Sequence, residues 1–164
     1  MPMSSLLDID LDYFCLVKNP VQRLRRLLAW AGCPVALVVE RHNKVLPFWR
    51  NLVRRERLAP PDHILHVDEH HDMMDERSTP NIGNFMRHAM AEWPKCRVYW
   101  MVEQGFDSPR MWLGDETWKR LRPRFRTGND IPPGWPKPDL VTVCTSPEFV
   151  DEGLRDRLTE ECGR

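Results

Sequence analysis

The chain has 164 residues, which is enough for one domain with a buried core and too few for two. Its 24 basic and 24 acidic residues balance, so no overall charge attracts nucleic acid or an anionic membrane. The sequence is 41% apolar with seven Trp, which favours a globular fold, and no apolar run approaches the roughly 20 residues of a membrane-spanning helix. No charged-then-apolar leader opens it, so we expect one cytoplasmic domain over residues 1–164.

Strand patterns and helix patterns alternate along the chain. Strands are expected over residues 5–14, 35–39, 63–68, 97–102 and 140–144, and helices over residues 20–31, 46–58, 83–93 and 149–161. The run 35–39 is apolar on both faces, as in a buried parallel strand, and the proline-rich residues 131–138 form a connecting loop. This alternation predicts an α/β fold with a central, mainly parallel sheet.

Neither a phosphate-binding loop nor a cysteine motif is present. The eight glycines form no GxGxxG or GxxxxGK pattern. The five cysteines, an odd number at irregular spacing, contain no CxxC pair, which argues against a zinc knuckle or a thioredoxin-type motif. We therefore expect reduced, mostly buried thiols.

Three aspartates alternate with apolar residues near the start of the chain: Asp8, Asp10 and Asp12. Alternate residues of a strand share a face, so these carboxylates would point together and repel one another at low effective dielectric. A bound cation turns that repulsion into attraction. The alternative, a solvated edge strand of acids, is disfavoured by the apolar residues that separate them through Phe14.

A second cluster follows the strand 63–68. Asp68, His70 and Asp72 form the pattern D-x-H-x-D where a strand gives way to a loop, the usual place for a site in a parallel sheet. Carboxylate and imidazole together suit manganese, iron or zinc better than magnesium or calcium. The neighbours Glu69 and His71 are expected to point away from the ion, one of them supporting a ligand. The two clusters supply more carboxylates than one ion needs, and two divalent ions about 3.5–4 Å apart would use them all.

These residues resemble a known family. The pairing of D-x-H-x-D with a second Asp-x-Asp strand is similar to the arginase and deacetylase fold, a three-layer sandwich. Several short sequence motifs resemble those of the peptide arginases, small atypical arginases that convert arginine to ornithine in ribosomally made peptides. The segments that carry this resemblance are residues 8–14 (DIDLDYF), 39–42 (VERH) with 46–47 (LP), 66–72 (HVDEHHD) and 146–149 (SPEF). They cover 24 residues of a resemblance that spans most of the chain.

The resemblance implies a ligand set for two manganese ions. Its members are Asp10, Asp12, His42, Asp68, His70 and Asp72. If the Asp-x-Asp motif is aligned two residues earlier, the pair is Asp8 and Asp10 in place of Asp10 and Asp12. Without the resemblance, His42 would be a surface histidine at the start of a helix. Glu148 would hold the substrate guanidinium, and without the resemblance it would be a glutamate stabilised at a helix N-terminus.

Two departures from ordinary arginases stand out. Their D-x-H-x-D strand precedes the Asp-x-Asp strand, whereas here the order is reversed, as in a circular permutation. Ordinary arginases also carry a proton-transfer histidine shortly after a Gly-Asn pair. Here Gly83-Asn84 is followed by Phe85 and Met86, so His88 and His71 remain the candidates for the catalytic acid or base.

The function that the resemblance implies is hydrolysis of a peptide arginine to ornithine and urea by metal-activated water. The expected partner is an arginine-containing precursor peptide, with no nucleic acid and no membrane, and self-association is left open. Three alternatives remain. They are a deacetylase or other amidohydrolase with an apolar tunnel in place of Glu148, a metal phosphoesterase, and a non-catalytic binding module that keeps the metal for folding.

Overall fold

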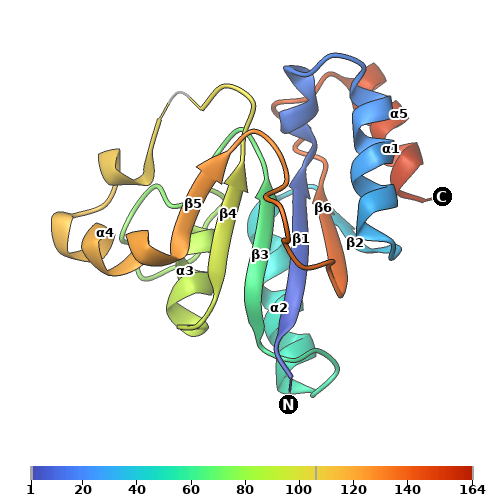
Figure 1. The fold of residues 1–164 in the computed structure, drawn as a ribbon. Helices are drawn as coiled ribbons and strands as arrows, with labels where there is room; N and C mark the ends of the chain where they lie inside the picture. Colours follow the sequence, from blue (N-terminus) through green and yellow to red (C-terminus); the bar gives the residue numbers. More distant parts are fainter. Residues whose placement is uncertain (1, 106, 164) are drawn as a thin grey trace.

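A single parallel sheet organises the chain. The computed structural model describes residues 2–105 and 107–163. Six strands pair in the order β2-β6-β1-β3-β4-β5, all of them parallel to their neighbours (Figure 1). Their bounds are β1 Ser4–Asp10, β2 Val35–Val39, β3 Pro61–Val67, β4 Arg97–Met101, β5 Phe125–Gly128 and β6 Leu140–Cys144. The expected α/β fold with a parallel sheet is confirmed.

Helices cover both faces of the sheet and complete a three-layer sandwich (Figure 1). Helices α1 (Pro20–Ala31) and α5 (Glu152–Cys162) lie on one face, and α2 (Val45–Arg54) and α3 (Phe85–Glu92) on the other. Helix α4 (Asp115–Leu121) precedes β5. Short 3₁₀ helices span Leu11–Cys15, His42–Lys44, Pro109–Met111 and Arg122–Arg124. No helix within the described residues has the length and apolar character needed to cross a membrane.

The strand pleat gives the two faces separate apolar cores. Leu6 of β1 and Ile64 of β3 point to the side of α2 and α3, where Trp49 and Phe85 are fully buried. Leu7 points to the opposite side, into the core beneath α1 and α5. Since alternate residues share a face, the even-numbered residues of β1 and β3, among them Asp8, Asp10 and His66, lie on the side of α2 and α3.

Two of the expected strands differ in the structure. The first ends at Asp10, whose side chain accepts the backbone N–H of Asp12 at 2.9 Å and so starts a 3₁₀ turn over Leu11–Cys15. Asp12 therefore belongs to a turn and not to the strand face. Strand β2 is an edge strand and not a buried one, with Val38 43% exposed, because only β6 pairs with it.

Other boundaries follow local backbone signals. Helix α1 ends where Gly32 adopts a φ of 70° and donates its N–H to the carbonyl of Leu28. Helix α2 ends at Arg54, earlier than expected, and Glu56 turns the chain with a φ of 58°. The sequence patterns did not indicate α4 or β5, while the loop over 131–138 and the strand Leu140–Cys144 are as expected.

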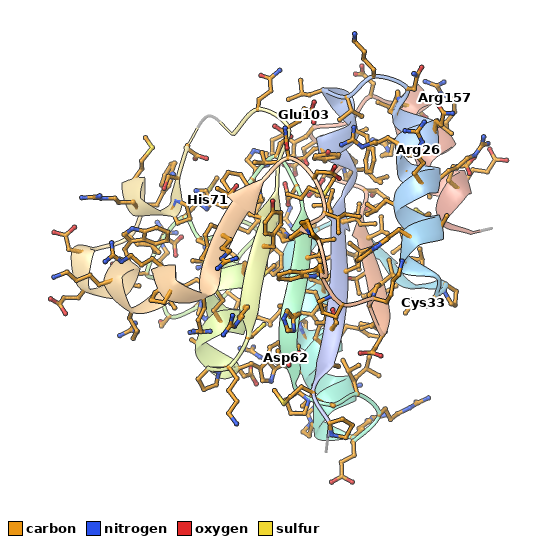
Figure 2. The ribbon with its side chains drawn as sticks, in the orientation of Figure 1. Arg26, Cys33, Asp62, His71, Glu103 and Arg157 are labelled. Carbon is orange, nitrogen blue, oxygen red and sulfur yellow. The ribbon has the colours of Figure 1, made fainter. Side chains whose placement is uncertain are left out.

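The sheet register brings the polar residues together. Strand β1 lies between β6 and β3, with Asp8 level with His66 and Asp10 level with Cys144. All six strands run the same way, so their carboxyl ends meet along one edge. Figure 2 labels Asp62 near the amino end of β3 and Glu103 beyond the carboxyl end of β4, which marks the two ends of the sheet. The acidic and histidine motifs lie at the carboxyl end.

Candidate metal centre

One buried cluster can hold a metal ion, and we call it the His42 group: His42, His66, Asp68 and Asp72. His42 comes from the 3₁₀ turn after β2, His66 from β3, and the two aspartates from the loop that follows β3. His42 Nδ1 lies 3.2 Å from Asp68 Oδ2 and 3.5 Å from Asp72 Oδ2. It also lies 3.1 Å from Oδ2 of Asp10 at the end of β1.

Unpaired buried atoms converge in this group. His42 Nδ1, Asp68 Oδ2 and Asp72 Oδ2 are buried, and although they lie close to one another, none of them makes a hydrogen bond of acceptable geometry among the described residues. Leaving such groups unsatisfied in a protein interior costs roughly 1–3 kcal/mol each, and more when they are charged. A cation placed among them would satisfy all three at once, and imidazole with carboxylate suits a first-row divalent metal. The residues therefore fit a metal ion.

Asp8 contacts both histidines of the His42 group. Its carboxylate is completely buried, and its Oδ2 lies 2.7 Å from His42 Nε2 and 2.9 Å from His66 Nδ1, while Oδ1 accepts the hydroxyl of Thr142 at 2.9 Å. A carboxylate on the far nitrogen fixes the ring orientation of a metal-binding histidine and strengthens it as a ligand. The structure thus gives Asp8 an orienting position and places Asp10 next to the free nitrogen of His42.

His66 differs from His42 in that both of its nitrogens have partners. Its Nδ1 faces Asp8, and its Nε2 lies 3.1 Å from the carbonyl of His70 and 3.1 Å from Asp72 Oδ2. Its ring is also fully buried. These contacts suit His66 to holding Asp72 and the loop after β3 in place.

A second set of ligands, the His70 group, consists of Asp12, Asp68 and His70. His70 Nδ1 lies 2.8 Å from Asp12 Oδ2 and 3.5 Å from Asp68 Oδ1. Asp12 also accepts the N–H of Glu69 at 3.3 Å, which ties the 3₁₀ turn after β1 to the loop after β3. Although Asp12 is not on the strand face, it still reaches the cluster.

Asp68 belongs to both groups, with one oxygen for each. Its Oδ2 faces His42, and its Oδ1 faces His70 and accepts the His70 N–H at 2.7 Å. Asp68 is 1% exposed, so neither oxygen relies on solvent. A carboxylate shared in this way lies between two adjacent sets of ligands.

The carboxylates of the cluster repel one another. Burial, with the charges of Asp72 and Asp10, raises the pKa of Asp68 to about 6. Burial and the charge of Asp68 likewise raise the pKa of Asp12 well above its ordinary value. Negative charge is thus concentrated where the dielectric is low, and positive charge is required to balance it.

Imidazoles supply that balance in the metal-free protein. Hydrogen bonds to Asp12 and Asp68 raise the pKa of His70 to about 11. Burial lowers the pKa of His66, but the carboxylates of Asp72 and Asp8 beside its two ring nitrogens outweigh it and raise that pKa to about 10. Since an imidazole binds a metal in its neutral form, an ion that enters the cluster would replace protons.

A cavity of about 270 Å³ opens onto the cluster. Asp10, His42, His70 and Asp72 form its polar floor. Glu148, beyond the end of β6, lies on its wall, and the Glu148 carboxylate is 3.6 Å from the guanidinium of Arg41. Both side chains are exposed by more than half. The structure thus brings Glu148 to the same cavity as the cluster.

The apolar wall of this cavity consists of Met74, Ile82, Pro147 and Phe149. Phe149 is 55% exposed, and its ring centroid lies 5.5 Å from that of His70. The cavity therefore combines a charged floor with a wall that suits an aliphatic chain.

The two histidines expected to move protons do not line this cavity. His71 is fully buried against Trp100, its Nε2 is 3.6 Å from Asp107, and burial lowers its pKa to about 4. His88 lies on α3 beside Arg87, with Nε2 3.1 Å from the carbonyl of Arg77. Neither is among the described residues that surround the cavity, so the geometry gives them no contact with a substrate there.

Ser146 was not expected from the sequence as a site residue. Its hydroxyl donates to Asp10 Oδ2 at 2.6 Å, and it holds a φ of 45°, which a non-glycine residue seldom adopts. Asp72 has a φ of 59°. Strained backbone of this kind concentrates at functional sites, where the surroundings enforce it. Both positions lie on the cavity.

No protein-family model, no curated protein and no solved structure matches the chain. The geometry of the cluster and the motifs of the sequence are therefore the ground for a functional proposal.

Proposed function

We propose that the chain is a binuclear metal hydrolase that converts arginine residues of a peptide to ornithine with release of urea. The observation that carries the proposal is the position of Asp68. With one oxygen toward His42 and the other toward His70, it would bridge two divalent ions, manganese in the family that the motifs resemble. Asp10 and Asp72 would complete the first ligand set, and Asp12 the second.

Two bound cations would supply a hydroxide near neutral pH and stabilise negative charge on the reacting centre. The residues of the chain would hold the reactants around that centre. Asp8 keeps the imidazole of His42 turned toward the carboxylates, and Ser146 fixes the carboxylate of Asp10. The apolar wall would take the aliphatic stem of the substrate side chain and exclude water from it.

Glu148 would recognise the guanidinium. Its carboxylate already lies beside a guanidinium, that of Arg41, on the wall of the cavity. The planar, many-donor head of arginine pairs well with a carboxylate. The pair with Arg41 is exposed and therefore weak, so a substrate could displace it. These features favour an arginine side chain over a neutral one.

The test is a urea-release assay on manganese-loaded protein with arginine-containing peptides, with mass spectrometry to locate ornithine. We expect urea and ornithine in equal amounts.

Glu148→Gln should keep its metal while turnover falls roughly ten- to a hundredfold, since a charge-assisted hydrogen bond contributes roughly 1.5–3 kcal/mol. Glu152→Gln, the same change at the exposed start of α5, should leave turnover unchanged. Equal rates in both variants would remove Glu148 from the substrate site, and loss of metal in Glu148→Gln would make it a ligand.

Deacetylation is the second candidate, and the apolar wall favours it. Met74, Ile82, Pro147 and Phe149 would suit the stem of an acylated lysine. An acetyl-lysine peptide in the same assay would release acetate without urea. Phosphate release from a phosphomonoester would indicate a metal phosphoesterase. Tight metal binding with no product from any of the three substrates would indicate a binding module.

A further inference from the structure

Cys144 lies beside the metal-binding residues but takes no part in the centre proposed above. It is the last residue of β6, level with Asp10 of β1 on one side and with Val39 of β2 on the other, and it is fully buried. Its Sγ donates to the carbonyl of Glu40 at 3.4 Å and lies 3.3 Å from Ser146 Oγ.

The thiol completes a third set of ligands. One ligand atom from each of Asp10, His42 and Cys144 lies within 4.8 Å of the other two, and all three residues are buried. Among the described residues, Cys144 is the one cysteine that belongs to such a set. A second observation points to an ion here, because His42 Nδ1 is buried and, although 3.1 Å from Asp10 Oδ2, makes no hydrogen bond of acceptable geometry in the described part of the chain.

The chemistry of this set differs from that of the other two. The His42 group and the His70 group offer carboxylate and imidazole alone. A thiolate is a soft ligand that selects zinc and cadmium over manganese, and a sulfur, a nitrogen and an oxygen with one open position are typical ligands of a zinc ion.

We propose that Asp10, His42 and Cys144 form a site for a thiophilic divalent cation, zinc in the cell, that competes with the harder ion of the His42 group. On binding, the thiol gives its proton to solvent and the sulfur forms a bond to the ion, with no change of oxidation state. The inference rests on the ion-binding half of the proposed function and not on its hydrolase half.

The two kinds of ion exclude each other because they share ligands. His42 has one ring nitrogen free for an ion, Nδ1, because its Nε2 faces Asp8, so it cannot serve both an ion held by Cys144 and one held by Asp68 and Asp72. A thiophilic ion would thus displace one manganese ion, and the chain would respond to the ratio of zinc to manganese.

The experiment is a cadmium titration followed by the ultraviolet charge-transfer absorption of the sulfur–cadmium bond. Burial raises the pKa of Cys144 to about 12, so the free thiol is protonated and contributes no thiolate signal beforehand. The starting protein carries Cys15→Ser and Cys33→Ser, because Cys15 is exposed and Cys33 is partly exposed. We expect a band that saturates near one cadmium per chain, and excess manganese should require more cadmium to reach it.

Two matched variants assign the sulfur. Cys144 and Cys96 are both fully buried, but Cys96 lies before β4, outside any metal-binding set of the described residues. Cys144→Ser should abolish the band, and Cys96→Ser should keep it. A band that survives in Cys144→Ser, or cadmium that binds by equilibrium dialysis without a band, would overturn the proposal.

A measurement without variants covers the case in which Cys144→Ser does not fold. X-ray absorption of the zinc-loaded starting protein should show one sulfur at about 2.3 Å and otherwise nitrogen and oxygen. A shell of nitrogen and oxygen alone would refute a role for Cys144, whatever the urea assay gives. Conversely, one sulfur on zinc together with no urea release would support this site and reject the hydrolase.

Discussion

The His42 group and the His70 group lie side by side and share Asp68, but they differ in burial. The side chain of His42 is 4% exposed and backed by Asp8, whereas that of His70 is 40% exposed and lies on the cavity. The first is therefore part of the protein interior, where an unpaired charge is costly, and the second faces the space that a substrate would enter. From this comparison we expect stability and ion binding to be coupled on one side of Asp68 and nearly separate on the other.

The largest effect should follow removal of the shared ligand. Asp68→Ala takes away one oxygen from each group, so we expect both ions to be lost together, measured by elemental analysis after gentle purification. Asp62→Ala, at the amino end of β3, the strand that Asp68 follows, should retain full metal content. Full metal content in Asp68→Ala would show that Asp68 is not a bridging ligand.

Loss of His42 should cost stability as well as metal. Asp8 and Asp10 would remain in a buried site without their partner, and breaking a buried charged pair costs roughly 3–5 kcal/mol. We therefore expect His42→Ala to lower the free energy of unfolding by about that amount in chelator, measured by urea denaturation. A loss under about 1 kcal/mol would mean that water enters the site and that it is not part of the core.

Asp8 offers a milder way to weaken the same group. Asp8→Asn keeps the shape but removes the charge that faces His42 and His66. Changes to such supporting residues typically lower metal affinity ten- to a hundredfold. We expect that loss for the ion of the His42 group, measured by competition with a chelating dye, and little change for the ion of the His70 group. An equal loss at both ions would remove the distinction between them.

The metal-free protein should lose stability gradually as pH rises from 7 to 10. The pKa of His66 is raised from 6.5 to about 10, so the folded chain holds this proton more tightly than the unfolded chain does. That contribution is complete below pH 6.5 and is lost as pH passes 10. Asp68 and His71, with pKa values of about 6 and 4, have finished titrating by pH 7. Melting temperatures in chelator should therefore fall over this range, whereas manganese-loaded protein should fall less, and parallel curves would contradict the exchange of protons for ions.

The sequence could predict the parts of the site that depend on local spacing. Asp68, His70 and Asp72 alternate where a strand ends, and the structure places Asp72 in the His42 group and His70 in the His70 group, each with Asp68. His42 could be added only through the resemblance, because it follows a different strand and its approach depends on the order β2-β6-β1-β3. No local pattern of residues reports the order of strands in a sheet.

The sequence provides only weak evidence for the roles of Asp8 and His66, which orient the possible ligands. Asp8 and His66 are polar residues that each stand between two apolar residues of a strand, and the structure pairs them in register on β1 and β3. A buried polar side chain requires a partner, so the sequence could have indicated that Asp8 and His66 each face another polar group, but not that they face each other. The brief elements α4 and β5 could not, since a strand of four residues with one apolar side chain, Phe125, shows no period.

The smallest effect on stability is expected at His70. Its pair with Asp12 is 40% exposed on the histidine side, and pairs open to solvent contribute about 0–1 kcal/mol. His70→Ala should therefore change the free energy of unfolding in chelator by no more than about 1 kcal/mol, while elemental analysis shows one ion fewer.

His63→Ala is the matched control, because His63 pairs with Asp62 at the other end of β3 with a side-chain exposure of 29%. It should show a similarly small loss of stability and no loss of metal. If His70→Ala instead destabilises the fold as much as His42→Ala, both halves of the cluster belong to the core, and the cavity does not separate substrate access from folding.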